Sequence, residues 1–291
     1  MTTLDTVLKT RYENIPFGLR RSFNQVYSTI GFEFKRNVKN IFISIGIALG
    51  VFLLSFIVNI VRESRGVSSP TTATEYIASY LNLVGFFILI IAVMYGGSII
   101  ALDYDKQTGN LLFPKITKGR LFVGRIIARY ILSVLAVTIF YIVTAITTLI
   151  KYQVLPVEIL ASWGWALFYT FLVLSMVTFF SSFLKKSSTT IVISLLMVLI
   201  VFNMGNVILT VTGIKVEPLF LLTYYSNIIT ASLDMPTDRY GEVPLGPPGP
   251  DTPTGFQWLT PSATGAAVGM LLYSAILLVA AYLLFRRRQQ K

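Results

Sequence analysis

Six long apolar runs, separated by charged segments, constrain this chain more than any other feature of its sequence. The runs cover residues 41–61, 77–102, 126–150, 163–184, 191–211 and 266–285. About 20 helical residues cross a hydrocarbon core of about 30 Å, so each run is long enough to span a bilayer. Only 13% of the residues are charged, against roughly 25% in soluble domains. The sequence therefore excludes a water-soluble globular protein.

The residue types that are missing exclude most familiar catalytic and metal chemistry. The chain has no cysteine and no histidine, which rules out disulfide scaffolds, Cys/His zinc sites, thiol nucleophiles and histidine-based triads. It also has no G-x-x-x-x-G-K-[ST] string, in which backbone amides and a lysine would hold nucleotide phosphates. We therefore predict that this chain is not an enzyme and that it holds no metal and no cofactor.

The distribution of basic residues predicts how the chain is oriented in the membrane. Nineteen of the 24 Lys and Arg residues lie on one side of the six runs, and five lie on the other. The positive-inside rule places the richer side, which carries both termini, in the cytoplasm. The net charge of +11 is thus an orientation signal and does not indicate nucleic-acid binding.

These patterns predict an all-α integral protein of the cell membrane with six transmembrane helices. Residues 1–40 form a cytoplasmic N-terminal segment, 41–285 the six-span domain, and 286–291 a basic cytoplasmic tail. An apolar stretch at 219–233, inside the external loop 212–265, is too short for a seventh span. We expect it to form a re-entrant or interfacial helix between spans five and six.

The residues before the first run predict an amphipathic helix. Apolar side chains recur there at spacings of three and four, which places them on one helical stripe: Leu19, Phe23, Val26, Ile30, Phe34 and Val38. Basic residues, including Lys35 and Arg36, occupy much of the remaining surface. We expect this helix to lie in the headgroup layer, either as a plain membrane anchor or as a contact for a cytoplasmic partner.

Polar groups are rare inside the six runs. The only charged one is Arg129, whose stem is expected to let the guanidinium snorkel to the headgroups. Asn82, Asn203 and Asn206 either line a pathway or bond neighbouring helices. The pair Gly96-Gly97 marks either a contact with a second copy or simple helix packing.

The cytoplasmic loop at 103–125 is the most informative segment. It presents a short apolar turn, Leu111-Leu112-Phe113, and both Pro114 and Gly119 are expected to break regular structure. Apolar side chains exposed on a cytoplasmic loop need a cover, which either lipid headgroups or a soluble partner can supply.

This loop resembles the corresponding loop of ABC transporter permeases of the ABC-2 type. In that family an acid, a glycine, three apolar residues, a proline and a Ser/Thr-basic step precede a Gly-Lys pair that opens a span. The matching positions here are Asp105, Gly109, Leu111, Leu112, Phe113, Pro114, Thr117, Lys118, Gly124 and Arg125. Asp replaces the usual Glu, Asn110 stands where Thr is usual, and Lys118 replaces Arg. The segments 31–38 and 283–288 are also similar to that family.

The resemblance implies a membrane subunit of an ATP-driven exporter that pairs with a second permease copy, identical or different, and docks separate ATPase subunits. ATP and Mg would bind on those partners. The implied coupling residues are Asp105, Gly109, Leu111, Leu112, Phe113, Pro114, Lys118 and Arg120, with Phe23, Ile30, Phe34, Lys35 and Arg36 on the N-terminal helix. The alternatives are a secondary transporter or channel, and a non-catalytic membrane assembly protein. The substrate is unidentified, and the scarcity of charge in the spans favours a hydrophobic, lipid-like or peptide cargo.

Overall fold

The computed structural model describes residues 19–64, 70–105, 116–212, 215–244 and 254–287. In these parts of the chain, six helical segments are long and apolar enough to cross a membrane. They are Val38–Ser64, Val84–Asp105, Lys118–Tyr152, Glu158–Phe183, Ser187–Thr212 and Ala263–Arg287. The prediction of six helices with the length and composition of membrane spans is confirmed.

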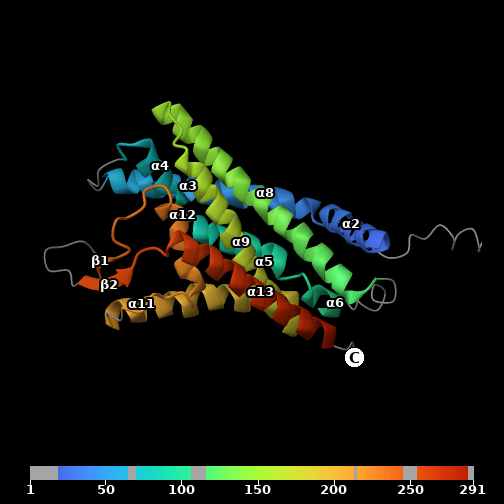
Figure 1. The fold of residues 1–291 in the computed structure, drawn as a ribbon. Helices are drawn as coiled ribbons and strands as arrows, with labels where there is room; N and C mark the ends of the chain where they lie inside the picture. The colour runs from blue at the N-terminus through green and yellow to red at the C-terminus, as the bar shows by residue number, and fades with distance from the viewer. Residues whose placement is uncertain (1–18, 65–69, 106–115, 213–214, 245–253, 288–291) are drawn as a thin grey trace, which may run out of the picture.

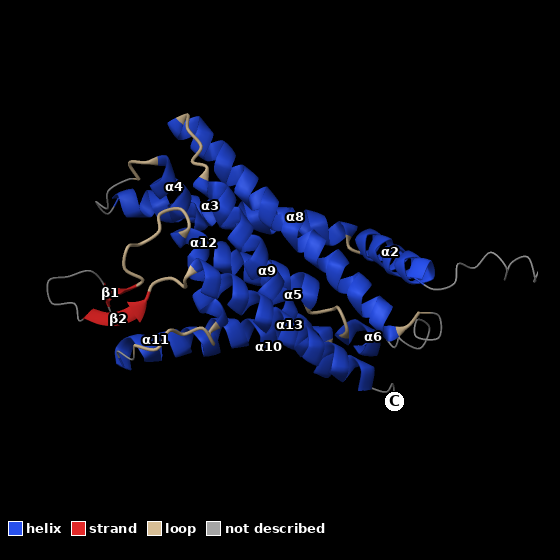
Figure 2. Ribbon diagram, viewed as in Figure 1, coloured by secondary structure: helices blue, strands red, loops and turns tan. Residues whose placement is uncertain are grey.

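The chain forms a helical bundle with one small β-ribbon at its end (Figures 1 and 2). The helices are α2 (Leu19–Arg36), α3 (Val38–Ser64), α4 (Ala73–Leu81), α5 (Val84–Gly96), α6 (Ala101–Asp105), α8 (Lys118–Tyr152), α9 (Glu158–Phe183), α10 (Ser187–Leu196), the π-helical η1 (Met197–Phe202), α11 (Asn203–Thr212), the 3-10 helix η2 (Leu222–Ser226), α12 (Asn227–Ala231) and α13 (Ala263–Arg287). The strands are β1 (Tyr240–Pro244) and β2 (Thr254–Trp258).

The β-ribbon departs from the all-α prediction. β1 and β2 pair antiparallel, with Tyr240 opposite Trp258. The ring of Tyr240 stacks on Phe256 at a centroid distance of 5.9 Å and meets Trp258 edge-on at 5.4 Å. Cross-strand aromatic pairs of this kind stabilise a short ribbon, which explains strands in a segment whose proline and glycine content predicts only a loop.

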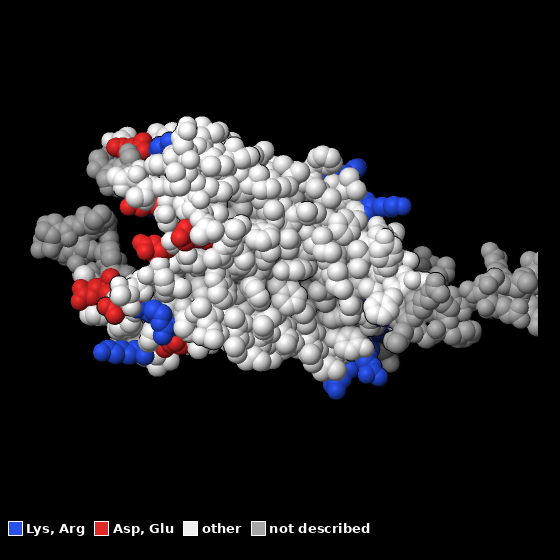
Figure 3. All heavy atoms as spheres, turned by 45° about the horizontal axis from the view of Figure 1, so that its top comes forward, with Lys and Arg blue, Asp and Glu red and all other residues white. Residues whose placement is uncertain are grey.

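The two ends of the bundle differ in charge. The beginning of α2, the helix α6 and the end of α13 lie at one end, and the β-ribbon lies at the other (Figure 1). On the face drawn in Figure 3, the end opposite the ribbon carries Lys and Arg atoms, whereas the ribbon end carries both signs. The described chain thus starts and finishes at its more basic end, and the cytoplasmic location of that end stays a prediction.

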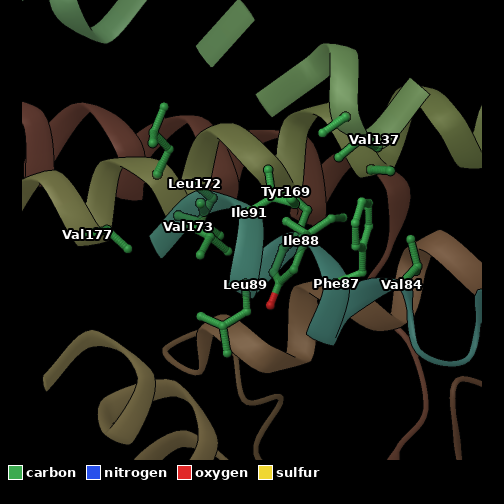
Figure 4. Close-up of a cluster of buried hydrophobic side chains, with 14 of the residues drawn as sticks. Val84, Phe87, Ile88, Leu89, Ile91, Val137, Tyr169, Leu172, Val173 and Val177 are labelled. Carbon is green, nitrogen blue, oxygen red and sulfur yellow. The ribbon is translucent and has the colours of Figure 1, made fainter. Parts of the chain in front are cut away.

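Helix α9 lies at the centre of the core. It packs against α5, α8, α12 and α13, and the fully buried Ile88 and Ile91 of α5 face Val173 and Leu172 of α9 (Figure 4). Apolar side chains that interdigitate in this way make many small dispersion contacts, which together stabilise the interface between α5 and α9.

The glycines of the second span serve this internal packing. A Cβ placed on Gly96 would lie 2.9 Å from Cγ1 of Val177 in α9, and one on Gly97 would lie 2.7 Å from Cγ1 of Ile191 in α10. Both positions are therefore covered by helices of the same chain. This is the simple helix packing that the sequence left open beside a contact with a second copy.

The second predicted span is interrupted. The run 77–102 begins inside α4, and the chain turns at Asn82 and Leu83 before α5 starts. α4 is a separate helix with its own capping box, in which Thr72 accepts a hydrogen bond from the backbone N–H of Glu75. Hydropathy alone cannot show such a break, because the residues on both sides are apolar.

The stretch 219–233 forms η2 and α12, which are too short to cross a bilayer. Tyr225, Ile228 and Ile229 are buried, and both elements pack against α9. No seventh span is present in the part of the chain described here. The re-entrant or interfacial position of this stretch relative to lipid stays a prediction.

The predicted 103–125 loop is shorter than expected. α8 begins at Lys118, so Gly119 lies in its first turn and does not break regular structure. The predicted coupling residues between Asp105 and α8 lie outside the described residues: Gly109, Leu111, Leu112, Phe113 and Pro114.

Candidate functional site: a buried charge cluster beside the loop

Helix α2 packs against α8 through a polar stripe. Thr29, Glu33 and Asn37 follow one another at spacings of four, and all three are buried. On the facing side, a Cβ on Gly124 would lie 2.9 Å from the Cβ of Thr29. The absence of a side chain on Gly124 therefore lets the two helices approach closely.

The predicted apolar stripe of α2 is not its packing face. Phe23 exposes 71% of its surface, Lys35 is exposed, and Ile30 and Phe34 are only half-buried. The exposure of these apolar side chains agrees with a face directed at the headgroup layer, and that position of α2 stays a prediction. Phe34 still packs at the edge of the core.

α2 also runs into α3 without a break in hydrogen bonding. The N–H of Asn37 donates to the carbonyl of Glu33, and the N–H of Ile41 donates to the carbonyl of Asn37, each at 3.1 Å. A displacement of α2 is therefore passed directly to the first span.

Glu33 joins three arginines from two helices. Its Oε2 accepts hydrogen bonds from Nη2 of Arg36 at 2.7 Å and from Nε of Arg129 at 3.0 Å. Its Oε1 lies 3.4 Å from Nε of Arg125. Arg129 also donates from Nη1 to Oδ1 of Asn37 at 2.8 Å. One carboxylate thus holds α2 against α8.

Arg125 extends the cluster to α6. Its two terminal nitrogens both donate to the carboxylate of Asp103, Nη2 to Oδ1 at 2.9 Å, and Nη1 also donates to the carbonyl of Ile99 at 2.8 Å. A two-point pair of this kind fixes the orientation of both side chains. The charge cluster, defined as Glu33, Arg36, Asn37, Asp103, Arg125 and Arg129, therefore joins α2, α6 and α8.

The charges in the cluster are nearly balanced. Glu33 and Asp103 neutralise Arg125 and Arg129, and the side chain of Arg36 remains 27% exposed. Burial lowers the pKa of Arg36, although the neighbouring carboxylate of Glu33 opposes this shift. Taking an unpaired ion out of water costs several kcal/mol. Arg125 and Arg129 can therefore be buried because Glu33 and Asp103 pair with them.

Arg129 does not snorkel as the sequence suggested. Its side chain is 1% exposed and is bonded to Glu33 and Asn37. The snorkelling argument treats a span as a single helix in lipid, whereas here Glu33 of α2 and Asn37, which links α2 to α3, accept from the guanidinium.

The start of α8 is bonded to both ends of the described chain. Nη1 of Arg120 donates to Oε1 of Gln25 in α2 at 2.6 Å. Nζ of Lys118 lies 3.4 Å from the carbonyl of Arg286 in α13 and 5.6 Å from the ring centroid of Phe285. These two predicted coupling residues contact neighbouring helices of the same chain, and Asp105 is exposed at the end of α6.

The three predicted asparagines lie together at a second place. Asn82, Asn203 and Asn206 line one cavity of about 280 Å³ between α5, α9, α11 and η2–α12. Asn206 also donates to Oγ1 of Thr223 at 2.9 Å, which is the bond to a neighbouring element that the sequence left open, whereas the pathway role stays a prediction.

The sequence interpretation missed the buried role of Glu33, Asn37, Asp103 and Arg125. A signal was present: Thr29, Glu33 and Asn37 recur at the helical spacing of four, and so do Arg125 and Arg129. Polar residues at helical spacing in α2, together with two arginines at helical spacing in α8, predict that the two helices pair through a buried polar interface.

Comparison with protein-family models and with curated proteins found no match to this chain. The described residues also contain no group of three or more Asp or Glu side chains that could hold a metal ion. The charge cluster, whose acids and bases are bonded to each other, is suited to joining helices rigidly and leaves no free acid–base pair for catalysis.

Proposed function

We propose that this chain is the membrane-spanning permease subunit of an ATP-driven ABC exporter of the cell membrane, similar to permeases of the ABC-2 type. Separate ATPase subunits would bind ATP and Mg and dock on the cytoplasmic segment between α6 and α8. A second permease copy, identical or different, would complete the transporter. The exported substrate would be hydrophobic, lipid-like or peptide in character.

The observation that carries this proposal is the position of the charge cluster. Asp103 lies in α6 and Arg125 in α8, so the bonded pair clamps the two helices on either side of the proposed docking segment. Glu33 adds α2, which continues into α3. A push on the docking segment would therefore move three elements together.

Helix α8 is long enough to carry that movement across the membrane. Its 35 residues at about 1.5 Å each give a rod of about 50 Å. Because α8 is clamped near its first turns, a tilt imposed there displaces its far end, beside the loop that leads to α9. Such a rigid-body tilt is one of the common ways in which a site changes its accessible side.

The two alternatives need features that the described residues do not favour. A secondary transporter couples to an ion through ionisable groups that change partners during the cycle. Here the buried Asp103, Arg125 and Arg129 are bonded to one another or to Glu33. A non-catalytic membrane assembly protein would need no ATPase partner, and this difference can be measured.

The test is co-purification of the chain with a soluble ATPase encoded by an adjacent gene, followed by Leu112→Glu and Asp105→Arg. We expect each change to reduce the amount of ATPase retained by roughly tenfold or more. Leu112→Glu places a charge in an apolar contact, and Asp105→Arg reverses the charge of a contact residue. Leu155→Glu, in the exposed segment between α8 and α9, is the matched control and should leave the complex intact. Unchanged complex formation and ATP turnover in both docking variants would show that the proposal is wrong.

A further inference from the structure

We infer that the cavity containing Asn82, Asn203 and Asn206 binds the uncharged, polyhydroxylated headgroup of an amphiphile, such as a glycosyl headgroup. That this amphiphile is the exported cargo rests on the proposed function, whereas its binding does not. The described lining residues contain amides, hydroxyls and apolar side chains but no Asp, Glu, Lys or Arg. A charged headgroup would lose its hydration there without gaining a counter-charge, which costs several kcal/mol.

The amides of the cavity present hydrogen-bond acceptors. The side-chain NH2 of Asn203 donates to the carbonyl of Leu199 at 3.1 Å, and that of Asn227 donates to the carbonyl of Leu259 at 2.9 Å. A backbone carbonyl can only accept, so these contacts fix which end of each amide is the donor. No described residue donates to the Oδ1 atoms, which remain available to a ligand.

The hydroxyls of the cavity add to this acceptor character. Ser226 donates to the carbonyl of Thr223 at 2.7 Å, and Thr230 donates to the carbonyl of Asn227 at 3.2 Å. Their protons are used within the chain, so each hydroxyl meets a ligand through its oxygen, which in Ser226 is shared with Tyr169. A ligand that supplies several O–H donors at once is the uncharged group that matches such a surface.

The polarity of the cavity changes along its length. α5 runs away from the ribbon end, and the α10–η1–α11 segment runs toward it (Figures 1 and 2). The lining residues Asn82 and Asn203 therefore lie nearer the ribbon end, whereas Leu89 and Val198 lie deeper. Seven residues of helix correspond to about 10 Å. An amphiphile can thus place its headgroup near the bundle end and its chain along the apolar part.

The floor of the cavity supports this arrangement. Tyr169 of α9 reaches past Leu89 of α5 with its hydroxyl outermost (Figure 4), and both side chains are lining residues. Gly85 lets η2 approach α5 closely, because a Cβ there would lie 3.3 Å from the Cβ of Ser226. The hydroxyl of Tyr169 adds a polar group between two apolar helices.

A second cavity of about 210 Å³ adjoins the first and shares Asn206 and Asn227 with it. It adds the aromatic rings of Phe256 and Trp258. The indole N–H of Trp258 is buried and has no acceptor among the described residues. An aromatic face beside an unpaired donor suits a hydroxylated ring, whose C–H face packs on the aromatic ring while its hydroxyls accept from the indole.

Photolabelling tests this inference directly. The probe is an alkyl glucoside with a diazirine on its alkyl chain, added to the purified chain in phosphatidylcholine vesicles without any ATPase. We expect labelled peptides to cover 82–89 and 198–206, with labelling suppressed by excess octyl glucoside. An alkylammonium, an alkyl phosphate and an acylated dipeptide at the same concentration should compete roughly tenfold less well.

Two substitutions sharpen the test. Asn206→Leu should reduce labelling roughly fivefold to tenfold, because a hydrogen bond to a neutral group contributes about 1 kcal/mol. Asn59→Leu removes the same group from the first span, where it bonds Ser79 outside this cavity, and should label normally. Size-exclusion profiles confirm folding of both variants. Labelling elsewhere in the wild-type chain, or equal competition by a charged or peptide amphiphile, overturns the inference even if the ATPase complex forms.

Discussion

At the scale of single residues, the charge balance of the bundle depends on Glu33. It lies within 3.4 Å of Nε of Arg125 and within 3.0 Å of Nε of Arg129, and its side chain is 1% exposed. Substituting Glu33→Gln leaves both arginines buried with one carboxylate fewer. Breaking a buried ion pair on one side costs about 3–5 kcal/mol, so we expect the free energy of unfolding to fall by about that amount.

Unfolding in mixed micelles of dodecyl maltoside and SDS measures this loss. Glu63→Gln is the control, because it removes the same charge from an exposed position at the end of α3 and should change the free energy by less than about 0.5 kcal/mol. Equal stability of the two variants would mean that Glu33 does not compensate the buried arginines.

The asparagines show how much of a site the sequence can indicate. Asn82, Asn203 and Asn206 could be singled out because an amide is rare inside an apolar run. Their meeting in one cavity could not, since it depends on the break between α4 and α5 and on the fold of η2–α12. Arg129 could likewise be singled out, but its acceptors Glu33 and Asn37 lie 96 and 92 residues away in the chain.

At the scale of elements, the contact between α5 and α9 depends on a missing side chain. Gly96→Ala would place a Cβ 2.9 Å from Cγ1 of Val177. We expect this overpacking to destabilise the protein by about 1–3 kcal/mol. Combining it with Val177→Ala should recover part of the loss, because the clashing methyl groups are removed.

The same substitution at Gly164 provides the comparison. That glycine lies within α9 and has no atom within 4 Å of a built Cβ. Alanine there should stabilise the helix by about 0.5–1 kcal/mol. Unfolding in mixed micelles distinguishes the two cases, and a Gly96→Ala variant as stable as Gly164→Ala would contradict the packing assigned to α5 and α9.

At this scale, apolar periodicity predicted where the spans lie but not how they are divided. The break at Asn82 and the π-helical segment η1 fall inside continuous apolar runs. A pattern that assumes one regular helix contains neither feature. The polar stripe of α2 was missed because the periodicity of the apolar residues was analysed and that of the polar residues was not.

At the scale of the whole molecule, charge and topology agree. An even number of candidate spans brings Leu19 and Arg287 to one end of the bundle, where α6 and the start of α8 also lie. The positive-inside rule predicts that this end is cytoplasmic. The proposed tilt of α8 requires this orientation, because an ATPase can push on the segment between α6 and α8 only from the cytosol.

Cysteine accessibility tests this central claim most directly, since the natural chain has no cysteine to interfere. Gly109→Cys and Thr237→Cys are each treated with a membrane-impermeant maleimide in intact cells and again after permeabilisation. The account predicts that Gly109→Cys reacts only after permeabilisation and that Thr237→Cys reacts in both conditions. Reaction of Gly109→Cys in intact cells would place the docking segment outside and contradict an exporter driven from the cytosol.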